Sequence, residues 1–446
     1  MNNVSERSVV GERRFLFLQG LMGPFFRELG KAFRKTGYGV YKINFNGGDR
    51  LFWGLPNGID FTGTDEEWPD FFQNVIKRYR ITDVILFGDC RPLHRVAIAT
   101  CARMHIPVHV FEEGYIRPDW VTLELGGVNG HSALPRDPEW YRREAALLPP
   151  MPPHHPVPSS FRRRALEAVA YNSADLLSRW HYRHWCDYRP WHPLKEGVGW
   201  IKRLRRRKAA TEEAMQIVQR VETQHIPYML FPLQLDADAQ VRLHSPFSGM
   251  KPALRKVIHS FATHAPKDLV LLVKEHPLDN GVRDWRELTR QIAQAENVAD
   301  RVYFLEAGDI AVIVRTAQGV VTINSTTGTL ALSSGVPVIT LGEAVYDIPD
   351  ITDQNGLDNF WAHPTPPDTA TFNAFYRVLV NRCLIAGGFF SPEGLSSLVD
   401  GVIHRVSQVL PAYNRMARVP DMVASAPALS EVVRVSRNVG MPDGVR

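Results

Sequence analysis

Charged and polar side chains gather where an apolar stretch of this chain ends. Lys274, Glu275, His276 and Pro277 directly follow the apolar run 269–273. In open α/β sheets, ligands bind at the carboxyl ends of the strands, and a cation next to an imidazole suits an anionic group there. The run 274–277 therefore predicts a phosphate site at the edge of a sheet.

A second candidate lies about fifty residues further along. The segment 318–324 reads as a buried strand that ends in Asn324, and Ser325, Thr326 and Gly328 follow it before a helical pattern begins. A hydroxyl-rich turn that opens a helix offers both side-chain oxygens and unpaired backbone N–H groups to an anion. We expect this turn to assist the run 274–277.

Two acidic clusters also follow predicted strands. Glu112 and Glu113 come at the end of the first, and Gln234, Asp236 and Asp238 come after the second. Because the carboxyl ends of parallel strands face a common crevice, we expect the clusters to converge with the phosphate site.

Such a set of groups would suit the transfer of a sugar from a nucleotide. That reaction passes through an oxocarbenium-like state, so a retaining enzyme needs a carboxylate that attacks the anomeric carbon, for which Asp236 or Asp238 is the candidate. His276 would stabilise the leaving phosphate, and Glu112 or Glu113 would deprotonate the acceptor hydroxyl.

Each group also has an ordinary structural interpretation. Asp236 and Asp238 would cap a helix or bend a loop, and Ser325 would cap the next helix. His276 would hydrogen-bond at a strand end that Pro277 terminates. Glu112 and Glu113 would form a solvated turn, and the basic runs 162–164 and 202–208 would be solvated faces.

The elements that would position these groups alternate between strand and helix. This alternation predicts an α/β fold with two Rossmann-like domains that face a central cleft, the GT-B arrangement. The predicted strands are 14–19, 39–45, 83–87, 107–111, 227–231, 269–273, 301–305, 320–323 and 337–341.

The predicted domains follow from where this alternation stops and resumes. The N-terminal domain spans 1–215 and includes a Pro-rich, aromatic and basic insertion of short helices at about 147–210, and the C-terminal nucleotide-sugar domain spans 216–370. We expect residues 371–419 to form helices that pack near the domain junction and residues 420–446 to form a mobile tail.

Composition narrows the class of protein. The chain has 446 residues, 44% of them hydrophobic, a net charge of +5 and four cysteines without metal-ligand or redox spacing. No apolar run is long enough to span a bilayer, and the first residues lack a signal peptide's apolar core. We expect a cytoplasmic protein with reduced thiols and an anionic partner. Nucleic acid ranks last among such partners, because no basic-aromatic platform or recognition helix is evident.

Taken together, the motifs at 112–115, 232–247, 274–277 and 324–328 resemble the capsule polysaccharide biosynthesis/export family of the KpsS/LipB type. The resemblance covers residues from about 13 to 345. It implies a retaining β-Kdo transferase that uses CMP-Kdo as donor substrate and starts the oligo-Kdo linker on a lysophosphatidylglycerol acceptor. It also implies a peripheral location at the cytoplasmic face of the inner membrane, with capsule assembly proteins as partners. We expect no cofactor or metal, because His276 and backbone N–H groups can replace a metal at the leaving phosphate.

The resemblance also implies residue roles. Asp238 would be the nucleophile, His276 and Pro277 would contact the CMP phosphate together with Ser325 and Thr326, and Glu112 or Glu113 would face the anomeric centre. Around them the predicted substrate-binding residues are Gln234, Asp236, Arg242, Lys274, Asn324 and Gly328. Arg242, Lys274 and the run 202–208 suit the anionic donor and acceptor. The alternative is a non-catalytic export or scaffold protein that binds lipid-linked polysaccharide.

Overall fold

The computed structural model describes residues 13–151, 156–186, 191, 193–236 and 238–408. The predicted tail, 420–446, and the N-terminal residues before 13 lie outside this range. The described chain divides into two compact units, each assembled from more than one segment. The first unit holds residues 13–128, 156–186 and 383–408, and the second holds the described residues from 129 to 151 and from 191 to 382.

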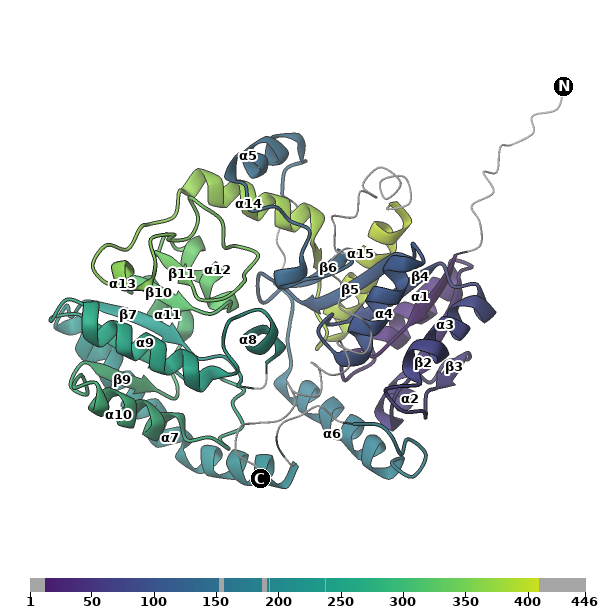
Figure 1. The fold of residues 1–446 in the computed structure, drawn as a ribbon, viewed down its shortest axis with the longest axis horizontal. Coiled ribbons are helices and arrows are strands. Elements are labelled where there is room, and N and C mark those ends of the chain that lie inside the picture. The colour runs from purple at the N-terminus through teal and green to yellow at the C-terminus, as the bar shows by residue number, and fades with distance from the viewer. Residues whose placement is uncertain (1–12, 152–155, 187–190, 192, 237, 409–446) are drawn as a thin grey trace. The chain divides into compact units, whose positions relative to one another are not determined.

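The first unit is built on a seven-stranded sheet of order β12-β6-β5-β4-β1-β2-β3 (Figure 1). Strands β1 to β5 pair in parallel, and β6 and β12 extend the β5 edge in antiparallel fashion. The strands are β1 (Arg14–Phe17), β2 (Gly39–Asn44), β3 (Gly58–Asp60), β4 (Asp83–Phe87), β5 (Val108–Glu113), β6 (Trp120–Leu125) and β12 (Leu384–Ala386).

Helices complete this unit and bury an aromatic core. Phe15, Phe17, Phe33 and Phe111 have no exposed surface. Phe33 lies 4.4 Å from Phe15 and 6.1 Å from Phe17, and Phe26 lies 5.2 Å from Phe17 and 6.1 Å from Phe111, distances typical of favourable aromatic pairs. The helices are α1 (Phe25–Lys35), α2 (Gly47–Trp53), α3 (Trp68–Tyr79), α4 (Pro92–Arg103), α6 (Phe161–Leu177) and α15 (Pro392–Gln408).

The second unit has a five-stranded parallel sheet of order β11-β10-β7-β8-β9. The strands are β7 (Tyr228–Pro232), β8 (Val270–Lys274), β9 (Val302–Leu305), β10 (Gly319–Thr322) and β11 (Val338–Thr340). The helices are η1 (Asn129–His131), α5 (Pro138–Leu147), α7 (Pro193–Thr223), α8 (Ala239–Leu243), α9 (Met250–His264), α10 (Trp285–Ala295), α11 (Ile310–Arg315), α12 (Thr326–Ser333), α13 (Leu357–Phe360) and α14 (Thr369–Arg382).

The α/β class and two Rossmann-like sheets are confirmed, and each predicted strand overlaps a strand of the structure. Two local predictions are wrong. The stretch 371–419 is not helical throughout, because β12 completes the first sheet by pairing with β6. The predicted short helices of the insertion include α7, whose 31 residues reach well beyond residue 210. The predicted boundary between residues 215 and 216 falls inside this helix.

The sequence missed α7's length because its many Arg, Lys, Glu and Ala residues favour a helix without marking a strong apolar face. The three-residue strand β3 and the six-residue strand β6 were missed as well, since neither has the continuous apolar run of a central strand. Among the residues that the structure describes, no helix combines the length and apolar composition needed to cross a bilayer.

Candidate functional site

Three of the four predicted clusters lie at one edge of the second sheet. Strands β10, β7 and β8 are neighbours and run parallel, so the residues that follow them leave the sheet on the same side. Asn324 follows β10, Gln234 follows β7, and Lys274 is the last residue of β8. The fourth cluster, Glu112 and Glu113, belongs to the first unit.

Gln234 and Asn324 form a reciprocal pair across the ends of β7 and β10. The Gln234 Nε2 donates to Asn324 Oδ1 at 2.8 Å, and the Asn324 backbone N–H donates to Gln234 Oε1 at 3.2 Å. The Asn324 amide group also donates to the carbonyl of Gln240 at 2.8 Å. Both predicted substrate-binding residues therefore hold the loop after β7 against the loop after β10.

Asp236 and Asp238 have different surroundings although they are two residues apart. The Asp236 carboxylate accepts from the Met250 backbone N–H at 2.9 Å and pairs with the Arg283 guanidinium at 3.3 Å. Asp238 instead caps α8, where its Oδ1 accepts from the Gln240 backbone N–H at 3.0 Å. Asp236 thus joins the loops after β7 and β8, while Asp238 caps the short helix α8.

Arg242 is half-buried on α8 and is turned back toward the same loop. Its Nε donates to the Asp236 carbonyl oxygen at 3.0 Å. This hydrogen bond holds α8, and Asp238 at its start, close to the end of β7. The guanidinium supplies positive charge at this edge of the sheet.

Lys274 and Glu275 are both buried at the end of β8, with 5% and 7% of their surface exposed. Burial lowers the pKa of Lys274 to about 8, and its Nζ donates to the Glu275 carbonyl at 3.2 Å. Burial raises the pKa of Glu275 to about 7, although the nearby Arg203 guanidinium acts in the opposite direction. Desolvation of the charged form outweighs the ion pair at this position.

His276 is half-buried and Pro277 is exposed in the turn that follows. The His276 Nδ1 accepts a hydrogen bond from the Leu278 backbone N–H at 3.1 Å. In the neutral ring this contact places the proton on Nε2, because a nitrogen that accepts cannot also carry the hydrogen. His276 therefore presents an N–H donor from Nε2, the form that a phosphate oxygen requires.

Arg203 holds the turn that contains His276 from the outside. Its Nη2 donates to the His276 carbonyl at 3.0 Å and lies 3.3 Å from the Glu275 carboxylate, and its Nη1 donates to the Asp279 carbonyl. In the same helix, Gly199 lies so close to the turn that an added Cβ would be 2.1 Å from the Asn280 carbonyl. Helix α7 therefore supports the predicted phosphate turn directly.

The basic run 202–208 is accordingly not one solvated surface. Arg203 is largely buried, and Arg206 pairs with Glu306 at 3.2 Å. Arg205, Arg207 and Lys208 remain exposed. The sequence interpretation treated the run as uniform, because nothing in its composition distinguishes the arginine that faces inward.

The turn after β10 opens α12 as predicted. Ser325 caps this helix by accepting from the Thr327 N–H at 3.2 Å, and Thr326, half-exposed, begins it. Gly328 packs against Tyr346, where an added Cβ would lie 2.4 Å from the phenolic oxygen. The same hydroxyl donates to the Ser325 carbonyl at 2.6 Å. Tyr346, which sequence reasoning did not identify, therefore fixes the shape of this turn.

Glu112 and Glu113 end β5 in the first unit and differ in their partners. The Glu113 carboxylate pairs with Arg117 at 2.8 Å and with Arg164 at 3.2 Å. The Glu112 Oε1 accepts from the Glu113 backbone N–H at 3.0 Å. Two guanidinium groups therefore hold the Glu113 carboxylate in place at the end of β5.

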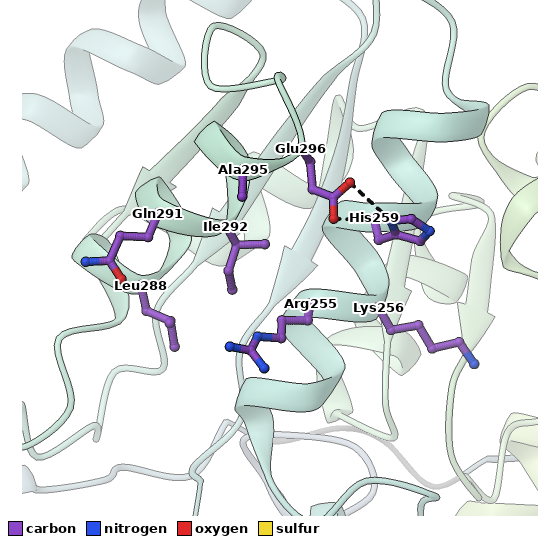
Figure 2. A pocket seen from close by; sticks show the side chains of 8 residues that line it. All are labelled: Arg255, Lys256, His259, Leu288, Gln291, Ile292, Ala295 and Glu296. Atoms are coloured by element: carbon purple, nitrogen blue, oxygen red, sulfur yellow. Dashed lines mark hydrogen bonds and ion pairs between the residues drawn. The ribbon is translucent and has the colours of Figure 1, made fainter.

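A surface hollow elsewhere in the second unit does not coincide with these residues. It has a volume of about 470 Å³ and lies between α9 and α10. The His259 ring lies 3.1 Å from the Glu296 carboxylate in this hollow, and Figure 2 shows the two side chains facing each other. Helix α9 begins at Met250, beside Asp236, and His259 comes nine residues later, about 13 Å along the helix axis. The hollow thus lies toward the opposite edge of the sheet.

The second sheet edge combines the parts that a nucleotide-sugar site needs. An imidazole N–H, a hydroxyl-rich helix start and the cations of Arg242 and Lys274 suit a phosphate, and the Asp238 carboxylate lies on the neighbouring loop. Arg203, Arg283, Gly199 and Tyr346 support these parts. No motif in the sequence marked the four supporting residues, because their roles depend on contacts between distant segments.

Comparison with known proteins gives concordant findings. The family model described as "Capsule polysaccharide biosynthesis protein" matches residues 82–390. The capsule polysaccharide export protein KpsS of Escherichia coli is 32% identical over 383 residues, which are 85% of this chain and 97% of that protein. The capsule polysaccharide modification protein LipB of Neisseria meningitidis serogroup A is 35% identical over 400 residues, 88% of this chain and 95% of that protein.

One solved structure also matches this chain. It is KpsC of Thermosulfurimonas dismutans, described as a beta Kdo 2,7 transferase, with 14% sequence identity and a TM-score of 0.40 over 87% of this chain and 99% of that one.

Proposed function

The chain belongs to the capsule polysaccharide biosynthesis family, and from this premise we propose that it is a retaining β-Kdo glycosyltransferase. It transfers Kdo from CMP-Kdo to a lysophosphatidylglycerol-type acceptor and so initiates the poly-Kdo linker of a capsular polysaccharide. The observation that carries the proposal is the arrangement at the second sheet edge, where the His276 turn, the Ser325 turn and Asp238 leave neighbouring strands.

In the first step the Asp238 carboxylate attacks the anomeric carbon while the bond from that carbon to the CMP phosphate oxygen breaks. The Nε2–H of His276, Ser325, Thr326 and the backbone N–H groups at the start of α12 stabilise the leaving phosphate. The product is a glycosyl-enzyme ester. No metal or cofactor takes part in this proposal, because the protein's own donors neutralise the leaving group.

In the second step the acceptor hydroxyl loses its proton to Glu112 and attacks the same carbon, which releases Asp238. Two inversions at one carbon give overall retention. The choice of Glu112 rests on the two arginine partners of Glu113. We place the enzyme at the cytoplasmic face of the inner membrane, because its acceptor is a lipid.

To test this, purified protein is incubated with CMP-Kdo and a lysophosphatidylglycerol analogue. The amounts of released CMP and of glycolipid product are then measured. The proposal predicts stoichiometric CMP and glycolipid, with the anomeric configuration of the donor retained. Product of inverted configuration would overturn the assignment of Asp238 as nucleophile.

A non-catalytic export or scaffold protein that binds lipid-linked polysaccharide is the second candidate, since the relative from Escherichia coli is called an export protein. Absence of CMP release, with a donor that a known transferase accepts, would favour that alternative over the enzyme.

A further inference from the structure

Helix α6 of the first unit carries an apolar stripe on its outer face, interrupted by the exposed Ser173. Leu166, Val169, Leu176 and Leu177 lie three, seven and one residues apart, and Trp180 follows in the turn after the helix. At 3.6 residues per turn these positions share one side. Their exposed fractions lie between 63% and 76%, so the stripe is open to solvent along the length of the helix.

The inner face of α6 is already occupied by its own unit. The Tyr171 hydroxyl accepts from Gln19 at 3.0 Å and from Asn46 at 2.9 Å. Helix α2 approaches so closely that a Cβ on Gly48 would lie 2.6 Å from the Tyr171 ring. Because α6 is packed firmly on this side, its outer stripe is a fixed surface and not the core face of a loosely attached helix.

The charges around the stripe have one sign. Arg162 is exposed at its start, and Arg183 and Arg179, which pairs with Asp175 at 3.7 Å, are exposed at its end. The two acids of the helix face inward: Glu167 is 13% exposed and pairs with Arg163, and Asp175 is 9% exposed. The outer face therefore presents apolar side chains bordered by cations and carries no exposed carboxylate within α6.

We propose that the outer face of α6 docks on the surface of an anionic phospholipid bilayer, with the stripe in the interface and the arginines among the head groups. Apolar stripes bordered by Arg, with Trp at one end, are typical of helices that lie in the plane of a membrane. A second copy of the chain is a poorer occupant, because antiparallel pairing of two such helices would bring Arg162 against Arg179 and Arg183.

Docking through α6 would also bring a lipid surface to within one helix diameter, roughly 10 Å, of the predicted base. Arg164, on the inner side of α6, pairs with Glu113 at 3.2 Å and stacks over Phe390 at 4.8 Å. The start of the helix is thus fixed beside the end of β5, where Glu112 lies. This part of the inference rests on the proposed function, which supplies the lipid acceptor, whereas docking itself does not require catalysis.

The experiment measures co-sedimentation of the full chain with vesicles of phosphatidylcholine alone or mixed equally with phosphatidylglycerol. We expect binding to the mixed vesicles that weakens as salt is added. The variant L166Q/L177Q should lower the partition coefficient about tenfold or more, because two side chains lose apolar area at the interface. The matched control is L147Q/M215Q, whose leucine and methionine are 81% and 64% exposed in the second unit.

Three outcomes would overturn the proposal. The wild-type protein does not bind anionic vesicles, or L166Q/L177Q binds them as tightly as wild type does. In the third, the control variant L147Q/M215Q loses as much binding as L166Q/L177Q. If wild type is a dimer that L166Q/L177Q converts to monomer while vesicle binding is unchanged, a second copy covers the stripe. Circular dichroism and thermal melting confirm that the variants fold.

A parallel assay separates this inference from the proposed function. With a short-chain lysophosphatidylglycerol kept below its micelle concentration, L166Q/L177Q should release CMP as fast as wild type does. If the wild-type protein itself releases no CMP in this assay, the proposed function is contradicted and the vesicle-binding result is unaffected.

Discussion

The guanidinium of Arg203 donates a hydrogen bond to the carbonyl oxygen of His276 across 3.0 Å, although the two residues lie 73 positions apart. The same guanidinium lies 3.3 Å from the Glu275 carboxylate. Through these contacts a helix that the sequence marks only as basic determines where the imidazole sits.

Replacing Arg203 by Gln should therefore loosen the turn that carries His276. Loss of a largely buried, charge-assisted contact that leaves Glu275 without its partner should cost about 2 kcal/mol in free energy of unfolding. The affinity for CMP should fall as well, and calorimetric titration would measure this. The exposed Arg205 provides the control, since R205Q should change stability by less than about 0.5 kcal/mol. Equal CMP affinity in R203Q and wild type would contradict the supporting role.

Two glycines in α7 should respond in opposite directions to the same substitution. A Cβ on Gly199 would lie 2.1 Å from the Asn280 carbonyl, whereas a Cβ on Gly197 would meet no atom within 4 Å. G199A should destabilise the protein by about 1–3 kcal/mol through overpacking, and G197A should stabilise it by up to about 1 kcal/mol through helix propensity. Thermal denaturation of both variants measures the difference, and a stabilising G199A would show that α7 does not press on the turn.

Asp238→Asn should abolish Kdo transfer without loss of stability. Asparagine is as good a helix cap as aspartate, so the contact with the Gln240 N–H is kept while the nucleophilic carboxylate is lost. The readouts are CMP release, CMP affinity and melting temperature. Asp236→Asn is the contrasting variant, because it weakens the ion pair with Arg283 and should lower stability. Turnover at the wild-type rate in D238N would rule out Asp238 as the nucleophile.

Glu112→Gln and Glu113→Gln should also separate chemistry from structure. E112Q removes the proposed base, so we expect kcat to fall by about 10²–10⁴-fold with little change in melting temperature. E113Q removes the partner of Arg117 and Arg164, and we expect it to act on stability more than on kcat. If E113Q lowers kcat and E112Q lowers mainly the stability, Glu113 is the base.

Stability should depend on pH through Glu275. Its pKa is about 7 in the folded protein, against about 4.3 for an exposed glutamate. The folded state thus holds this proton more tightly than the unfolded chain does. The resulting stabilisation is complete below about pH 4.3 and is lost as the pH rises through about 7, a change of about 3–4 kcal/mol.

Urea denaturation across this pH window, with E275Q beside wild type, tests the assignment. The variant should lack this component of the pH dependence. The titration of Lys274 affects stability only at higher pH. Its pKa is about 8 in the folded protein and about 10.4 in the unfolded chain, so the unfolded chain binds this proton more tightly and stability rises between these two pH values. Identical slopes in the two proteins between about pH 4.5 and 7 would exclude Glu275 as the titrating group.

The sequence by itself determined the α/β class and the strands that carry the candidate residues. Buried parallel strands such as β7 and β8 read as apolar runs, because both of their faces are covered, and polar residues such as Gln234 and His276 mark where they end. No local signal in the sequence predicts the strand order β10-β7-β8. This order brings the loops that follow the three strands to one edge of the sheet.

Only the tertiary structure decided which groups are structural supports and which surface is apolar. Asp236 and Asp238 look alike in the sequence, and the partner Arg283 distinguishes them. In the same way, Arg203 faces inward from a basic run, and the stripe on α6 emerges only once Tyr171 fixes which side of the helix is buried. Local patterns specify elements, because periodicity and turn chemistry act over a few residues. The pairing of distant residues depends on packing, which local patterns do not encode.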